Sequence, residues 1–255
     1  IRNKGFPVYS GGDDVLALTP IERWFEIVRI LRSHFWGDEE SLFHRIRVGG
    51  RNVVIAQAIP TGRSFSVRVA DILDIMSHEI SIALELLESK AKNAKWVKPY
   101  GVFKDSLVLS DSRSGVEVVF PLSMTCGVRR VLVADRVLRT LETMFIAENL
   151  GVISSNIPED LVNMLRDPLT GEKVNTGDEL LLEALLRMFK RTLYRNIHVR
   201  KDEAIKFKMD PFEVTAGKIV DGIGGDAVLS MWNNDRRRRL LEELVDFVRA
   251  SRGWL

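Results

Sequence analysis

The first residues of the chain alternate between short apolar runs and a glycine-rich turn. Phe6–Tyr9 and Val15–Leu18 are apolar and flank the segment Ser10-Gly-Gly-Asp-Asp14. Because glycine readily adopts the positive φ that tight turns need, this pattern predicts a β-hairpin. Apolar residues then recur at helical spacing from Trp24 to Phe35, which predicts an amphipathic helix after the hairpin.

The next hundred residues continue as a mixture of strands and helices. After the polar stretch Arg47–Asn52, the apolar run Val53–Ile59 predicts a buried strand. A long helix is predicted from Val67 to Ala94, with an apolar stripe made of Ile72, Ile75, Met76, Ile80, Ala83, Leu84 and Leu87. A second hairpin follows, from the runs Ser106–Leu109 and Val116–Phe120. The predicted order over the first 122 residues is β-β-α-β-α-β-β.

Beyond residue 125 the pattern becomes helical. Helices are predicted at about 129–149, 158–166, 178–195 and 226–250, separated by loops with proline and glycine. The fold class expected is therefore α+β: a mixed domain over residues 1–125 followed by a mostly α-helical domain over residues 126–255.

Composition narrows the class of protein without identifying it. The chain has 255 residues, of which 45% are hydrophobic and 28% charged, which argues against disordered and disulfide-stapled classes. No apolar stretch approaches the roughly 18 residues that a membrane-spanning helix needs. The single cysteine, Cys126, fits a reducing, cytoplasmic setting. The net charge of +2 does not identify a nucleic-acid binder, and the start at Ile1 suggests a piece of a larger protein.

The first hairpin carries the residues with the clearest chemistry. Gly11 and Gly12 let a phosphate or a metal approach the backbone closely, and Asp13 and Asp14 supply hard oxygen ligands of the kind that Mg²⁺ or Mn²⁺ prefers. At a hairpin tip both carboxylates could reach one metal-bound triphosphate, as in phosphoryl transfer. The alternative is a plain surface turn, since Gly-Gly-Asp is also good turn composition.

The run Tyr9-Ser-Gly-Gly-Asp-Asp-Val-Leu-Ala-Leu18 resembles the signature hairpin of the large palm-domain subunit of type III CRISPR effector complexes. The residues after the aspartates look more like the type III-B (RAMP-module) branch. The strand at 53–59, the helix ending in Leu86–Lys95 and the run Lys104–Leu109 occur in the order of that family. The helical segment after residue 125 is similar to its C-terminal domain by position and character.

This resemblance implies a truncated ferredoxin-like palm of the polymerase and cyclase type. In that family the palm joins ATP molecules into cyclic oligoadenylates when the complex binds target RNA. Asp13 and Asp14 would then hold the catalytic Mg²⁺ or Mn²⁺ ions, and Gly11 and Gly12 would let the triphosphate lie against the turn. Lys92 or Lys95 would contact a phosphate, although a solvated helix end is the favoured explanation of these lysines. The partners implied are other effector subunits, with guide RNA and target RNA bound mostly through them.

The chain also departs from the family pattern. Such a palm begins with a strand that carries another acidic metal ligand and with a helix, and this sequence starts at the hairpin instead. None of His34, His44, His78 and His198 is followed by Asp, and one cysteine cannot build a zinc site, so no HD nuclease or zinc module is expected here. The sequence is therefore expected to hold part of an ATP site.

Two other segments and two other functions are alternatives to this interpretation. Asp221–Leu229 repeats Gly-Gly-Asp but lacks the second aspartate, and a glycine-rich link explains it better. Arg236–Arg239 could contact RNA phosphates or an acidic subunit, or form a solvated helix end. A catalytically silent subunit that anchors proteins and RNA is the alternative function. A diguanylate-cyclase-like domain ranks lower, because Val15 stands where those domains carry Phe.

Overall fold

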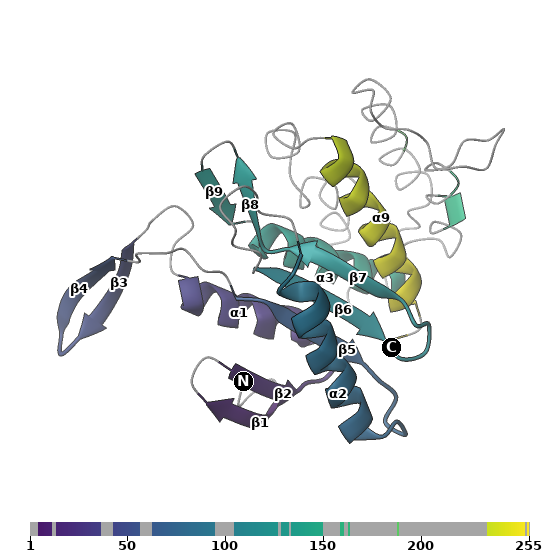
Figure 1. The fold of residues 1–255 in the computed structure, drawn as a ribbon, viewed down its shortest axis with the longest axis horizontal. Helices are drawn as coiled ribbons and strands as arrows, with labels where there is room; N and C mark the ends of the chain where they lie inside the picture. Colours follow the sequence, from purple (N-terminus) through teal and green to yellow (C-terminus); the bar gives the residue numbers. More distant parts are fainter. Residues whose placement is uncertain are drawn as a thin grey trace, which may run out of the picture. The chain divides into compact units, whose positions relative to one another are not determined.

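The computed structural model describes residues 5–11, 14–36, 43–56, 63–94, 105–126, 129–132, 134–149, 159–160, 163, 188, 234–252 and 254 (Figure 1). The chain divides into two compact units. The first comprises residues 1–113 and 121–138, and the second comprises residues 114–120 and 139–255. The mixed content agrees with the predicted α+β class, whereas the boundary at residue 125 stays a prediction.

The first unit opens with the predicted hairpin and helix. β1 (Phe6–Gly11) and β2 (Asp14–Leu18) pair antiparallel, and α1 (Trp24–Trp36) follows. The spacing of apolar residues in α1 places Trp24, Phe25, Ile27 and Val28 in the core. Hairpin and helix are thus both confirmed.

The sequence predicts a polar stretch at Arg47–Asn52 and a buried strand at Val53–Ile59. The structure has a β-hairpin in this region instead. β3 (Phe43–Val48) and β4 (Arg51–Ala56) pair antiparallel around Gly49 and Gly50. The prediction was wrong in omitting β3 and in starting the second strand too late, because alternating Arg and apolar residues are typical of a strand with two different faces. Val53 is 39% exposed, so the prediction that this strand is buried was wrong at Val53. Residues 57–59 lie outside the described part of the chain.

The helix predicted over residues 67–94 is correct only in its second half. Phe65–Val69 is a strand, β5, that pairs parallel with β6 (Ser106–Asp111). The helix α2 begins at Met76, ends at Leu86 and continues as a π-helical turn, η1 (Leu87–Ala91). The prediction missed β5 because Ile72 and Ile75 happen to continue the helical spacing of α2, yet both lie in the connection and are exposed.

Three of the described strands form one sheet. Its order is β5-β6-β7, with β7 covering Glu117–Pro121, and all six residues of β6 are buried. Contact between α2 and β5, and the ion pair of Arg68 Nε with Glu79 Oε2 at 2.6 Å, hold the helix to this sheet (Figure 1). The predicted strands around the turn at residues 111–115 are confirmed.

The helix predicted over residues 129–149 is also too long at its start. β8 (Ser123–Cys126) pairs antiparallel with β9 (Arg129–Leu132), and α3 begins at Ala134 and ends at Asn149. Pairing with β8 makes Arg129–Leu132 a strand, which helical periodicity does not reveal. The segment Asp221–Leu229 lies outside the described residues.

The second unit contains α9 (Asn234–Ser251), the described part of the helix predicted at 226–250. Leu240, Leu244 and Val248 repeat at helical spacing and are buried. Phe247 meets Phe120 edge-on, with ring centroids 6.2 Å apart. Of the two helices predicted between α3 and α9, only residues 159, 160, 163 and 188 are described, each as helical. The helical character of residues 126–255 as a whole therefore stays a prediction.

Candidate functional site

The candidate site is the end of the β1–β2 hairpin in the first unit. The strands pair from Phe6↔Leu18 to Gly11↔Asp14, with one irregularity between Pro7 and Tyr9. Gly11 and Asp14 therefore face each other as the last described pair. Gly12 and Asp13 stand between them in the sequence and lie outside the described residues. The register brings two of the predicted site residues together.

Gly11 is closely covered by an aromatic ring from its own strand. A Cβ built on Gly11 would lie 2.4 Å from Tyr9 Oη and 2.8 Å from Tyr9 Cζ. Residues two apart on a strand face the same side, so the phenol of Tyr9 occupies the space that a side chain at Gly11 would need. The sequence assigned Gly11 to close approach by a phosphate. The structure adds a second reason for glycine here, and it brings Tyr9, which the sequence analysis did not select, to the candidate site.

Asp14 presents its carboxylate at the surface. The residue is exposed, and the carboxylate makes no hydrogen bond or ion pair with another described residue. An exposed carboxylate without a protein partner is available to a cation, and carboxylate oxygens are what Mg²⁺ and Mn²⁺ favour. The donor chemistry of Asp14 therefore fits such a metal.

The described residues do not by themselves form a complete metal site. Within the described ranges, no group of three or more His, Cys, Asp or Glu side chains is close enough to hold one ion. Mg²⁺ usually keeps several waters and takes one or two carboxylates together with substrate phosphates. A site that uses the paired aspartates and a triphosphate matches this pattern better than an all-protein cage.

Of the two candidate lysines, only Lys92 lies among the described residues. Lys92 forms an ion pair with Glu88, four residues earlier, and its backbone N–H donates to the carbonyl of Leu87 at 2.9 Å. No described hydrogen bond or ion pair joins Lys92 to Gly11 or Asp14. This arrangement resembles the solvated helix end that was the alternative for Lys92. Lys95 lies outside the described residues.

The hairpin is attached to α1 by a close backbone approach. A Cβ on Gly5 would lie 2.7 Å from the carbonyl oxygen of Leu18 and 3.3 Å from Ile27 Cδ1, so a larger residue would force the strands and helix apart. The position of Asp14 relative to α1 thus depends on Gly5 as well as on the strand pairing.

A buried ion pair, which the sequence analysis did not identify, ties α1 to the start of β6. Arg32 Nε and Nη2 donate to Asp105 Oδ1 and Oδ2 at 2.5 and 2.6 Å, and the side chains are 1% and 0% exposed. The N–H of Asp105 donates to Ser64 Oγ at 3.1 Å, and its carbonyl accepts from the N–H of Leu122 at 2.9 Å. The only sequence signal was the run Lys104–Leu109, which contains Asp105 without indicating its partner.

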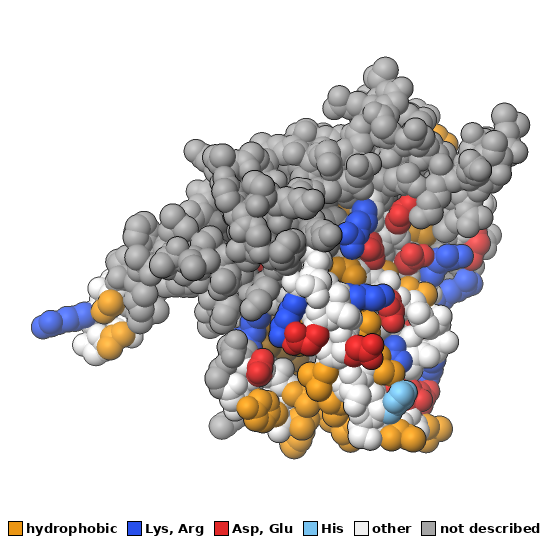
Figure 2. Space-filling model, viewed as in Figure 1, with side chains coloured by type: hydrophobic (Ala, Val, Ile, Leu, Met, Phe, Trp, Pro, Cys, Tyr) orange, Lys and Arg blue, Asp and Glu red, His pale blue; other side chains and the backbone are white. Residues whose placement is uncertain are grey.

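Apolar side chains before α2 are exposed rather than buried. Ile72 is 96% and Leu73 88% exposed, and Figure 2 shows apolar side chains gathered along the lower edge of the view. Asp71 anchors this segment: it forms an ion pair with Arg113 and accepts a hydrogen bond from the N–H of Leu73 at 3.1 Å. The hydrogen bond from Arg113 is the main cause of the lowered pKa of Asp71. The predicted apolar stripe is therefore wrong at Ile72, Ile75, Met76 and Leu84, which are all exposed.

Comparison with known proteins covers the part of the chain that contains this hairpin. Residues 1–96 match the family "Cas10/Cmr2, second palm domain". The "CRISPR system CMR subunit Cmr2" of Saccharolobus solfataricus is 31% identical over 136 residues, which cover 48% of this chain. The chain spans 12% of the length of that relative. No solved structure matches the chain. Among the helices that the structure describes, none has the length and apolar character that a membrane crossing requires.

Proposed function

We propose that the chain acts in a type III CRISPR effector complex, because residues 1–96 match the second palm domain of the Cas10/Cmr2 family. Its reaction there is metal-dependent nucleotidyl transfer that joins ATP molecules into cyclic oligoadenylates when target RNA is bound. The partners are other effector subunits, with guide RNA and target RNA held largely through them.

The observation that carries this proposal is the exposed Asp14 carboxylate beside Gly11 at the end of the hairpin. A turn that served structure alone would gain nothing from two consecutive aspartates, since unpaired like charges repel each other. Asp14 has no described protein partner that would explain it as part of an internal ion pair. Its exposure instead suits a ligand that comes from solution.

Asp13 and Asp14 would hold Mg²⁺ or Mn²⁺, which supplies charge neutralisation to the attacking and leaving oxygens of phosphoryl transfer. A ribose hydroxyl of one ATP attacks the α-phosphorus of another, and pyrophosphate leaves. The absence of side chains at Gly11 and Gly12 would let the triphosphate approach the backbone. Tyr9 covers Gly11 and would limit the directions of this approach. A phosphate contact by Lys92 or Lys95 would require Lys92 to leave Glu88.

The test is the double substitution Asp13→Ala with Asp14→Ala in the polypeptide that carries this sequence, assembled with its effector subunits and guide RNA. With ATP, Mg²⁺ and target RNA, we expect oligoadenylate to fall by at least about 100-fold, because the groups that hold the metal are lost. Product is measured by chromatography and mass spectrometry, and target RNA binding is measured in parallel and should not change.

The matched control replaces Glu22 and Glu85, two exposed carboxylates of the first unit, with alanine. This variant removes the same charge and should keep oligoadenylate synthesis within about twofold, because surface substitutions away from a site have small effects. Undiminished product from the aspartate variant contradicts the site assignment. No product from the unsubstituted complex with any target RNA supports the silent, anchoring subunit instead.

A further inference from the structure

The β3–β4 hairpin is a basic ribbon with no acidic residue. Residues 43–56 contain Arg45, Arg47, Arg51 and His44, and neither Asp nor Glu. The chain as a whole is nearly balanced, with 37 basic and 35 acidic residues. The ribbon is therefore a local concentration of positive charge that the composition of the whole chain hides.

The end of the ribbon has a defined backbone. Gly49 and Gly50 have φ of 56° and 81°, and Val48↔Arg51 is the closing pair, which is the geometry of a two-residue primed turn. Such a turn matches the twist of the strands and fixes their register. A Cβ at either glycine would have no described atom within 4 Å, so the turn is open to a ligand.

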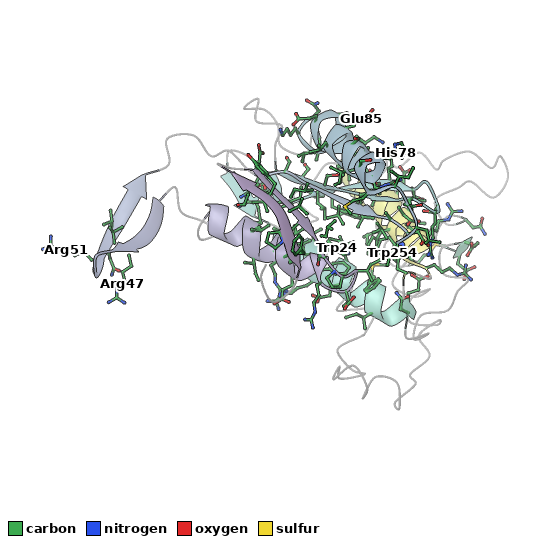
Figure 3. The ribbon with its side chains drawn as sticks, turned by 90° about the horizontal axis from the view of Figure 1, so that it is seen from below. Trp24, Arg47, Arg51, His78, Glu85 and Trp254 are labelled. Atoms are coloured by element: carbon green, nitrogen blue, oxygen red, sulfur yellow. The ribbon has the colours of Figure 1, made fainter. Side chains whose placement is uncertain are left out.

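The register places arginines on both faces of the ribbon end. Arg47 pairs with Asn52 and Val48 with Arg51, and cross-strand partners share a face while neighbours along a strand alternate. Arg47 and Arg51 therefore point to opposite sides. Both are exposed, and Figure 3 shows both at the end of the hairpin. In Figure 2, blue spheres of Lys or Arg project at the same end, beside hydrophobic side chains.

Neither guanidinium is neutralised by a described carboxylate. Two other exposed arginines of the described residues do lie beside carboxylates. Arg113 faces Asp71, and Arg249 Nη1 lies 3.6 Å from Asp246 Oδ1. For Arg47 and Arg51, no hydrogen bond or ion pair is found among the described residues. Their charges remain available to an external anion.

From this geometry we infer that the β3–β4 ribbon binds the phosphodiester backbone of a nucleic acid through Arg47 and Arg51. A guanidinium donates two parallel hydrogen bonds to a phosphate, and a two-stranded ribbon is narrow enough to enter a nucleic-acid groove. Cations on both faces suit phosphates on two sides of a groove or a strand that wraps the ribbon. An acidic protein surface would contact only one face of the ribbon, and therefore only one of the two arginines. This inference is independent of the nucleotidyl-transfer proposal.

The test uses the 255-residue chain and fluorescently labelled single-stranded RNA, duplex RNA and duplex DNA. Anisotropy titrations at several salt concentrations give the affinity and its salt slope for each nucleic acid. For Arg47→Ala with Arg51→Ala we expect about tenfold weaker binding. We also expect the slope of log K against log salt to fall by about 1.4 for single strands or about 1.8 for a duplex, because two phosphate contacts are lost. The nucleic acid with the larger loss identifies the form that the ribbon binds.

The matched control is Arg23→Ala with Arg249→Ala, which removes two exposed arginines that lie beside carboxylates. It should keep the affinity within about twofold and leave the salt slope unchanged. Arg47→Lys with Arg51→Lys should also retain the slope, because the charges remain. Equal weakening by the control pair, no change on removing Arg47 and Arg51, or no binding of the unsubstituted chain to any of the three nucleic acids below about 100 µM overturns the inference.

Discussion

Glu148 is the residue whose chemistry burial changes most clearly. It lies on α3 in the second unit, and its Oε2 accepts a hydrogen bond from Ser251 Oγ at 2.8 Å. Burial raises the pKa of Glu148 to about 7, because the ionised carboxylate loses its hydration. The hydrogen bond from Ser251 offsets only part of this effect. Near neutral pH the side chain is therefore only partly ionised.

The raised pKa has a definite effect on stability. A carboxyl whose folded pKa exceeds its unfolded value of 4.5 stabilises the fold while it is protonated, and this contribution is lost as pH rises toward about 7. Glu148→Gln keeps the shape and stays neutral. We expect the variant to be more stable than the unsubstituted chain at pH 8, by on the order of 2 kcal/mol, and nearly equal at pH 4.5.

Urea unfolding followed by tryptophan fluorescence at both pH values measures this difference. Glu159→Gln, at an exposed position, serves as the control and should leave the pH dependence as it is. If Glu148→Gln loses stability between pH 4.5 and 8 as steeply as the unsubstituted chain, Glu148 is not responsible.

At the scale of elements, Asp105 connects several segments of the first unit. Its carboxylate binds Arg32 of α1, and its N–H donates to Ser64 Oγ, which in turn donates to the carbonyl of Ala91 at 3.2 Å. Asp105 also has φ of 81°, a left-handed conformation that Asp and Asn tolerate better than most side chains. Asp105 thus combines a left-handed backbone conformation with a buried charge.

Asp105→Asn separates these two contributions, because asparagine keeps the shape and tolerates the same φ. We expect a loss of about 3–5 kcal/mol in the free energy of unfolding, since Arg32 would keep a buried charge without its counterion. The matched change Asp71→Asn breaks the exposed pair with Arg113 and should cost far less, because water screens both charges. Urea unfolding of both variants measures the comparison. Equal losses would show that burial of the Arg32–Asp105 pair has little effect on its contribution.

At the scale of the whole molecule, the described carboxyls whose pKa is raised belong to one unit. Glu148 and Glu243 both lie in the second unit, and burial raises the pKa of Glu243 as well, although Glu243 accepts a hydrogen bond from the N–H of Val119 at 2.7 Å. In the first unit, Asp71 has a lowered pKa, and its contribution to stability is lost only in acid. The pH dependence that Glu148 causes between about 4.5 and 7 therefore belongs to the second unit, whereas that of Asp71 belongs to the first.

Hydrogen exchange measured by mass spectrometry can detect this difference. Between pH 6 and pH 8, after correction for intrinsic exchange, we expect peptides from α3 and α9 to lose several-fold protection, because Glu148, whose pKa is about 7, ionises in this range and destabilises the second unit. Peptides from β5 and β6 should keep their protection. In Glu148→Gln the loss in α3 and α9 should disappear. A uniform change across both units would contradict the assignment to Glu148.

Local sequence signals predicted the elements whose partners are close along the chain. The β1–β2 hairpin, α1, the strands around residues 111–115 and most of α3 and α9 follow from periodicity and turn residues. The sequence also identified the Gly-Gly-Asp-Asp hairpin and, by resemblance, the palm family that residues 1–96 match. These features depend on neighbouring residues, so the linear order of side chains is enough to recognise them.

Only the tertiary structure decided the features that join distant segments. Phe65–Val69 became a strand because it pairs with β6, and Arg32 found Asp105 across 73 positions. Tyr9 covers Gly11 in a way that composition does not show, and the exposed Ile72 and Leu73 fit a helical spacing that the chain does not use. The physical reason is that strand pairing, ion pairing and burial are satisfied between segments, whereas periodicity reports only the preference of a segment by itself.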